Sequence, residues 1–190
     1  MITDQLSTFI KLFEYYKLLG DQTFTQLNAD QLNHRGHAES NSIVTIVKHL
    51  HGNMISRWTD CLVSDGEKPG RNRDEEFIHE TLSFEEMKSL WEEGWTCLSN
   101  ALKSFSTGNL ESIIFIRNQG HTLLEAIYRQ LAHYSYHVGQ IVFIGKILSG
   151  NDWKSLSIPK GQSIIYNEGK FLNAPLKQHF TDEYRHDLKA

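Results

Sequence analysis

The segment LLEAIYRQLAHYSYHVGQIVFIGKILSG, residues 123–150, is the longest stretch of helical periodicity in the chain. Its apolar residues recur at intervals of three and four, which is the spacing that places side chains on one face of an α-helix. The pair Ser149-Gly150 is a typical helix C-terminus. We therefore expect a long, mostly buried helix from about His121 to Leu148.

Three further segments have the same periodicity, at residues 3–27, from Ser42 to about 63, and from Ser83 to about 107. The third begins with the capping-box pattern, a serine followed three residues later by a glutamate. Gly20 lies inside the first segment and weakens its helical pattern. Together with residues 123–150, these segments predict an all-α protein built as a four-helix bundle.

The rest of the chain is polar or irregular. Residues 64–76 (SDGEKPGRNRDEE) are typical of a charged surface loop, and Ile113–Ile116 of a short extended segment. Residues 151–190 have no clear period and are expected to form an irregular tail packed on the bundle. No repeat or change in composition suggests a boundary, so we expect one domain over residues 1–190 with a core at about 3–150.

Composition limits the classes of function. The 190 residues carry a formal net charge of -4, which gives no overall attraction to nucleic acid or to an anionic membrane. No apolar run is long enough to span a membrane, and MITDQLSTFI at the start does not resemble a signal peptide, so we expect a cytoplasmic protein. Only Cys61 and Cys97 are present, without a CxxC pair, which excludes a disulfide framework and a cysteine-rich zinc site.

Two of the ten histidines, His133 and His137, lie four residues apart in the apolar segment. This spacing places both imidazoles on one helix face, where they could chelate one metal ion. The alternative is a pair of hydrogen-bonded core histidines. A third ligand would come from the second helix, where His49 shares the inward stripe with Ile46 and Asn53, whereas His51 points away from it.

Three segments, IVKHLHGNMISRWTD with the following DGEKPGRNRDEEF, then EAIYRQLAHYSYHVGQIV and SLSIPKGQS, resemble the DinB/YfiT-like superfamily of bacterial metal-binding bundles, in particular an uncharacterised subgroup. The resemblance spans most of the chain and places the family's metal ligands on His49, His133 and His137. It also implies an up-down-down-up topology with a long crossing connection between the second and third helices. Many relatives are dimers. The best understood are thiol S-transferases or thiol-dependent isomerases that use bacillithiol or mycothiol, and some were described as metal-dependent hydrolases.

Three neutral imidazoles would leave a divalent ion with its full charge and an open coordination position, as in catalytic zinc sites. Such an ion lowers the pKa of a bound water molecule or thiol. We expect one ion per chain, zinc by default, although imidazole ligands also suit nickel, iron or copper.

Several polar residues could assist the metal. Asn53, Gln130 and Gln140 lie near the faces of the three histidines and could orient an imidazole or hold a substrate oxygen, or they could be ordinary amides at a helix seam. Arg71 and Arg73 could receive an anionic substrate, but the acidic residues around them are typical of solvated surface. No Asp or Glu shares the histidine faces, so no general base is predicted.

The predicted function is therefore a metal-dependent enzyme, a thiol S-transferase acting on a small-molecule thiol and an electrophile. The alternatives are a metal-dependent hydrolase and a metal-binding dimeric scaffold without turnover. The helix at residues 123–150 is apolar almost all round, which predicts a homodimer.

Overall fold

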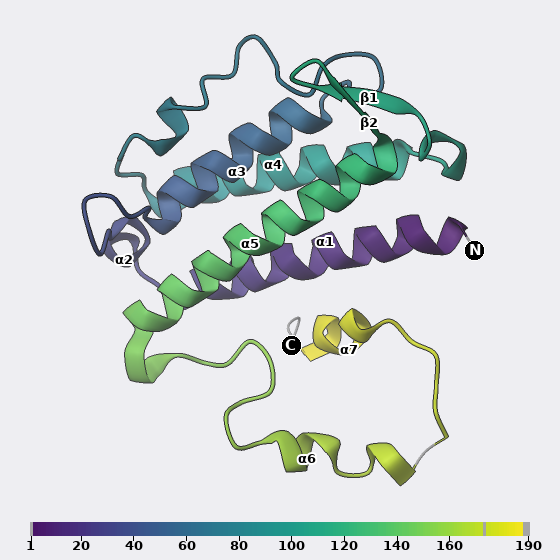
Figure 1. Ribbon diagram of the computed structural model, residues 1–190. Helices are drawn as coiled ribbons and strands as arrows, with labels where there is room; N and C mark the ends of the chain where they lie inside the picture. Colours follow the sequence, from purple (N-terminus) through teal and green to yellow (C-terminus); the bar gives the residue numbers. More distant parts are fainter. Residues whose placement is uncertain (1, 173, 188–190) are drawn as a thin grey trace.

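The computed structural model describes residues 2–172 and 174–187, and four long helices form its body (Figure 1). These are α1 (Ile2–Phe24), α3 (Ile43–Trp58), α4 (Phe84–Ser104) and α5 (Leu123–Ser149). The shorter elements are α2 (Ala29–Asn33), η1 (Glu75–Phe77), η2 (Thr107–Asn109), β1 (Ile113–Ile116), β2 (Gln119–Thr122), η3 (Gly150–Asp152), α6 (Ser163–Asn167), η4 (Lys170–Leu172) and α7 (Phe180–Asp187). The expected all-α bundle is confirmed.

The long helices form two parallel pairs that run in opposite directions. Phe9 near the start of α1 packs against Tyr128 near the start of α5, and Gln26, just after α1, accepts a hydrogen bond from Ser149 at the end of α5. Figure 1 shows α3 and α4 running side by side in one direction, opposite to α1 and α5. The up-down-down-up order requires residues 59–83 to cross back along the bundle from the end of α3 to the start of α4.

Side-chain caps define the helix starts. Ser42 caps α3, while Ser83 and Thr122 each form a capping box at α4 and α5. In the boxes a hydroxyl and a glutamate three residues later satisfy backbone N–H groups that have no intrahelical partner. α5 begins at Leu123, not at His121 as the periodicity predicted, because residues 119–122 pair with β1.

Close packing explains why α1 continues past Gly20 as far as Phe24. A Cβ atom at Gly20 would overlap the ring of Trp91 on α4, so the glycine lets the indole contact the α1 backbone. Three tryptophans, Trp58, Trp91 and Trp95, are buried in the core. Beyond Phe24 the chain turns, and the helix does not reach Leu27.

The extended segment expected at Ile113–Ile116 is one strand of a two-stranded antiparallel hairpin. Arg117 and Asn118 both adopt positive φ angles, 55° and 59°, as a tight two-residue turn requires. The Asp65 carboxylate accepts hydrogen bonds from both of their backbone N–H groups, at 2.9 and 2.7 Å. The turn is therefore attached to the crossing connection, which brings both segments to one end of the bundle.

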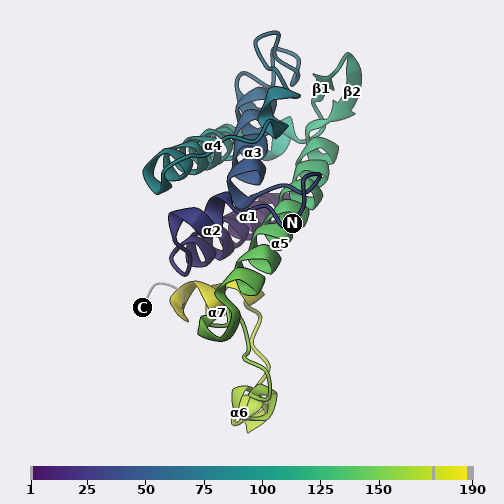
Figure 2. The ribbon, with the colours of Figure 1, turned by 90° about the vertical axis from the view of Figure 1, so that its left-hand side faces the viewer.

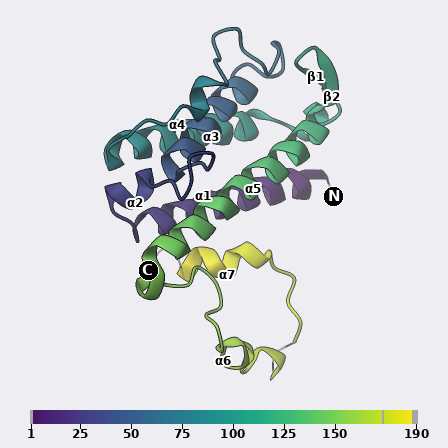
Figure 3. The ribbon, with the colours of Figure 1, turned by 60° about the vertical axis from the view of Figure 1, so that its left-hand side comes forward.

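Two regions outside the four long helices contain short helices that the periodicity did not predict. The polar linker after α1 includes α2, and the tail includes α6 and α7. α7 lies against α1, where Lys11 pairs with Asp182 at 2.9 Å and Tyr15 contacts the ring of Phe180. Figures 2 and 3 show α6 held away from the four long helices. In the described part of the chain, no helix combines the length and apolarity needed to cross a membrane.

Candidate metal centre

Three imidazoles from two antiparallel helices converge at one point of the bundle. His133 Nε2 lies 3.2 Å from His49 Nε2 on α3 and 3.1 Å from His137 Nε2, one turn further along α5. One ligand atom from each ring lies within 4.8 Å of the others, an arrangement that could hold a metal ion. His51 points instead to α4, where its Nε2 lies 3.0 Å from Glu93.

Each of these imidazoles has an oxygen partner at its other ring nitrogen. The Nδ1 pairs are His49 with Glu76 Oε2 at 2.9 Å, His137 with Gln140 Oε1 at 2.8 Å, and His133 with Gln130 Oε1 at 3.4 Å. An ionised carboxylate only accepts hydrogen bonds, so Nδ1 of His49 must carry the proton. In the neutral ring, Nε2 then keeps its lone pair and faces the centre of the cluster.

The surroundings of the cluster disfavour protonated imidazoles. Burial lowers the pKa of His133 to about 3, and the charges that His137 and His49 would carry add to this effect. Burial also lowers the pKa of His137, although its hydrogen bond with Gln140 partly opposes the change. Both rings on α5 are therefore neutral at physiological pH, which is the form that binds metals.

Glu76 belongs to the crossing connection and is held from both sides. Arg71 donates to its two oxygens, from Nε at 2.7 Å and from Nη2 at 3.0 Å. Burial alone would raise the pKa of Glu76, but the hydrogen bonds from His49 and Arg71 outweigh it and hold that pKa below its ordinary value. Gly52, three residues after His49, leaves the space for the carboxylate, since a Cβ there would overlap it.

The interpretation of the acidic residues of this loop as solvated surface was wrong for Glu76, which is 8% exposed. Helical periodicity could not place it beside His49, because it comes from a connection and not from a helix face. The one local signal was Gly52, a small residue on the His49 face of α3.

A cavity of about 420 Å³ opens beside the histidines. The crossing connection, the hairpin turn, α3 and α5 all contribute to its walls. Its lining consists of His49, Asn53, Arg57, Arg71, Arg73, Phe77, Arg117, Arg129, Gln130, His133 and His137. Asn53 uses its side-chain oxygen to accept a hydrogen bond from the Tyr134 hydroxyl at 3.0 Å. Gln140 is not part of the lining and contacts the site only through His137.

Arg71 and Arg73, the two arginines singled out in the sequence, both line this cavity, but they differ in exposure. The Arg71 side chain is 5% exposed and paired with Glu76, whereas that of Arg73 is 50% exposed and lies over the Phe77 ring. Three more arginines that the sequence did not predict as site residues line the cavity, namely Arg57, Arg117 and Arg129.

Over residues 1–162 the chain matches the model of a family described as a protein of unknown function, DUF1572. The chain belongs to the DUF1572 family. The matched region contains all three histidines and every residue that lines the cavity. No curated protein and no solved structure matches the chain.

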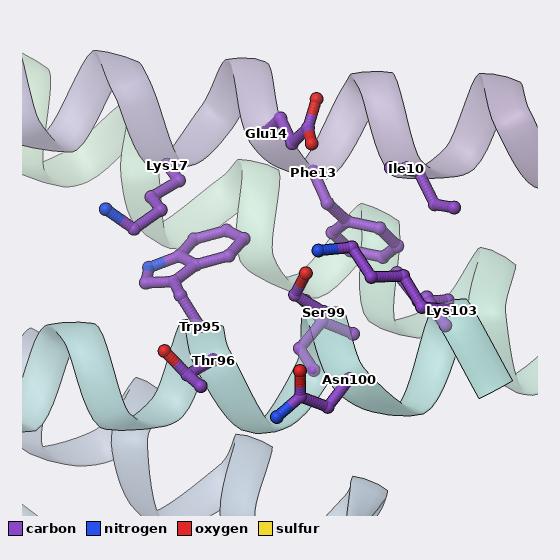
Figure 4. A pocket seen from close by; sticks show the side chains of 11 residues that line it. Ile10, Phe13, Glu14, Lys17, Trp95, Thr96, Ser99, Asn100 and Lys103 are labelled. Atoms are coloured by element: carbon purple, nitrogen blue, oxygen red, sulfur yellow. The ribbon is translucent and has the colours of Figure 1, made fainter.

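The DUF1572 chain has another cavity, of about 310 Å³, between α1 and α4. Figure 4 shows Phe13 and Trp95 in its wall, with the polar side chains of Lys17, Ser99 and Lys103 around them. None of the residues that line it is histidine or cysteine, so it offers no comparable donor set. Its chemistry does not resemble that of the histidine cavity.

The two cysteines of this DUF1572 protein are poor nucleophiles. Burial raises the pKa of Cys61 to about 11, and burial also raises the pKa of the half-buried Cys97. Both thiols are therefore protonated near neutral pH. Neither lines the histidine cavity, so a sulfur nucleophile there would have to come from a substrate.

Proposed function

We propose that this protein is a divalent-metal-dependent enzyme of the DinB/YfiT type, in which His49, His133 and His137 hold the ion. The observation that carries the proposal is the orientation of the three rings. Their Nε2 atoms face one another, while every Nδ1 atom has an oxygen acceptor. Ligand histidines in metalloproteins typically use their second nitrogen in this way.

A metal ion explains this arrangement better than hydrogen bonding among the rings. Three lone pairs at separations of 3.1 and 3.2 Å repel one another unless a proton or a cation lies between them. Protonating a ring is costly here, because burial opposes the charge. Three neutral nitrogens also suit zinc, our first choice, as well as nickel or iron, and an ion with only three protein ligands would keep a coordination position for a substrate.

We propose thiol S-transfer as the reaction, with a low-molecular-weight thiol as one substrate. A bound divalent ion would lower the pKa of a thiol or of a water molecule that it contacts. No Asp or Glu is among the residues lining the cavity. Hydrolysis of an amide needs a group that delivers a proton to the leaving amine, whereas an ionised thiol that displaces a group stable as an anion needs no such delivery. Small thiols are kept reduced in the cytoplasm, where we place the protein.

The test of the metal site is elemental analysis of protein purified without a histidine tag. We expect about one divalent ion per chain in the wild type. His133→Ala and His137→Ala should lose most of it, while His51→Ala, the matched control on the opposite face of α3, should retain it. A wild type without metal, or equal loss in all three variants, would contradict the proposal.

The test of the reaction uses protein loaded with cobalt. Addition of a small thiol should produce a sulfur-to-metal charge-transfer band in the near ultraviolet, with an apparent pKa well below the free-thiol value of about 8.5. If thiols leave the spectrum unchanged while simple esters or amides are cleaved, the protein is a hydrolase. If neither occurs, the non-catalytic scaffold becomes the better description.

A further inference from the structure

The histidine cavity is strongly basic, although the protein as a whole carries a net charge of -4. Five arginines line it, on α3, on the crossing connection, on the hairpin turn and on α5. They are Arg57, Arg71, Arg73, Arg117 and Arg129. Residues far apart in the sequence thus bring like charges together, which costs electrostatic free energy unless an anion compensates for it.

Two carboxylates neutralise part of this charge. Glu67 lies 3.2 Å from Arg57, 3.0 Å from Arg117 and 3.6 Å from Arg71. Glu76 binds Arg71 but also serves His49. Two carboxylates against five guanidinium groups leave the cavity with a clear excess of positive charge.

The excess is concentrated on Arg73 and Arg129. The nearest carboxylate to Arg73 belongs to Asp74, at 3.9 Å, and that side chain is 97% exposed. Arg129 is exposed, and within residues 2–172 and 174–187 its guanidinium group has no hydrogen bond or ion pair. Neither guanidinium group is paired with a buried carboxylate, so both can bind a ligand.

A buried donor at the cavity supports the same conclusion. The Arg57 side chain is 6% exposed, and two of its contacts are with the Gly66 carbonyl and Glu67. Its Nε atom is buried and has no hydrogen-bond partner. A buried donor without a partner is costly, and an acceptor on a bound ligand or an ordered water molecule would satisfy it.

We propose that the cavity binds a small molecule that carries an anionic oxygen group, a carboxylate or a phosphate, and that Arg73 and Arg129 hold this group. Guanidinium groups bind both anions through paired, charge-assisted hydrogen bonds. A volume of about 420 Å³ suits a small ligand. The inference rests on the proposed function only in placing the ligand's reacting atom at the histidines, because the anion site is made of protein groups alone.

The experiment measures binding to full-length protein from which metal has been removed with a chelator and the chelator dialysed away. Succinate and methyl phosphate are titrated calorimetrically at low ionic strength, with succinamide as the uncharged control. We expect at least one of the two anions to bind and succinamide not to bind. The affinity for the anion should fall as salt is added. Preference for succinate or for methyl phosphate identifies the anion as carboxylate or phosphate.

The variants Arg73→Gln and Arg129→Gln should each weaken anion binding by about tenfold, the effect of losing a charge-assisted hydrogen bond. Arg35→Gln, in the linker between α2 and α3 and outside the cavity, is the matched control and should bind as the wild type does. Both cavity arginines are exposed, so these variants should fold, which circular dichroism checks.

Absence of binding by both anions, or wild-type affinity in both Arg73→Gln and Arg129→Gln, would overturn the proposal. Metal content measured on the same preparations, before chelation, separates the two ideas. Anion binding by a protein that never contains metal would refute the metal-dependent function but leave the anion site standing. A protein that contains metal but binds neither anion would refute the anion site and leave the metal-dependent function standing.

Discussion

At the scale of single residues, the candidate site depends on which nitrogen of each imidazole carries the proton. The Nδ1 atoms of the three imidazoles contact side-chain oxygens of Glu76, Gln130 and Gln140. The Nε2 lone pairs of the rings therefore point to the centre of the cluster. Glu76 differs from the two amides because it is charged. It therefore increases the electron density on His49 as well as orienting it, and Arg71 keeps it ionised.

Replacing this carboxylate should weaken the metal site without abolishing it. In Glu76→Gln an amide oxygen can still accept a hydrogen bond from His49, but the charge is lost and Arg71 loses its ion pair. We expect metal affinity to fall by about 10- to 100-fold, the usual effect of losing an outer partner of a ligand histidine. Competition with a chromophoric chelator measures it. Glu75→Gln, an exposed neighbour, should keep wild-type affinity; equal affinities in the two variants would show that Glu76 plays no part.

At the scale of helices, glycines at the seams let α1 approach its neighbours closely. Gly20 faces Trp91 on α4, and a Cβ atom at Gly145 on α5 would overlap Thr23 on α1. These contacts explain why a residue that usually weakens helices is tolerated here, since a close approach of the backbones buries aromatic and aliphatic surface.

Two glycine substitutions should have opposite effects on the free energy of unfolding, because Gly20 packs against α4 whereas Gly139 has open space around it. Gly20→Ala should lower the free energy of unfolding by about 1–3 kcal/mol, because its methyl group would overlap the buried indole. Gly139→Ala, on α5 with open space around it, should raise that free energy by about 0.5–1 kcal/mol through helix propensity. Denaturant unfolding followed by circular dichroism measures both. A stabilising effect of Gly20→Ala would be incompatible with the close contact.

α5 also exposes apolar residues on its outer face, and these predict self-association. Tyr136, Phe143 and Ile147 are each more than 60% exposed and lie along one stripe of the helix. We expect a homodimer that buries this stripe, because exposed apolar surface of this kind marks interfaces.

Sedimentation or light scattering at micromolar concentration should therefore detect a dimer, which the double variant Phe143→Ser/Ile147→Ser converts to a monomer. Val63→Ser removes an even more exposed apolar side chain, 88% exposed, from the crossing connection and should leave the dimer intact. A monomeric wild type would disprove the prediction.

At the scale of the whole molecule, a metal ion would join α3 to α5, which run antiparallel and lie far apart in the sequence. A ligand that binds only the folded state adds about 2.7 kcal/mol of stability at a concentration 100 times its Kd. For a protein of 190 residues, this corresponds to a change in melting temperature of about 5–10 °C.

Chelation should therefore lower the melting temperature of the wild type by about that amount, as differential scanning calorimetry would measure. His49→Ala should melt at the same temperature with and without the chelator, and His51→Ala should respond as the wild type does. If chelation has no effect on the wild type, no ion stabilises the fold.

The local sequence pattern was sufficient to predict part of the candidate site. Helical spacing places His133 and His137 on one face, and the apolar stripe of α3 separates His49 from His51. Both conclusions depend on residues within a few turns of one another, where helix geometry alone sets direction. The same reasoning led to the bundle as the fold class, since four amphipathic segments must bury their apolar faces together.

The sequence alone thus determined the four long helices, the face of each that turns inward, and the three histidines that meet there. Only the tertiary structure decided what surrounds them. Glu76 and Arg117 come from the crossing connection and from a hairpin turn, where no periodicity relates a residue to a helix face. Arg129 lies on the exposed side of α5. Their positions depend on how the chain returns between α3 and α4 and on the hydrogen bonds of Asp65 that attach the turn, and these are contacts between residues about 50 positions apart.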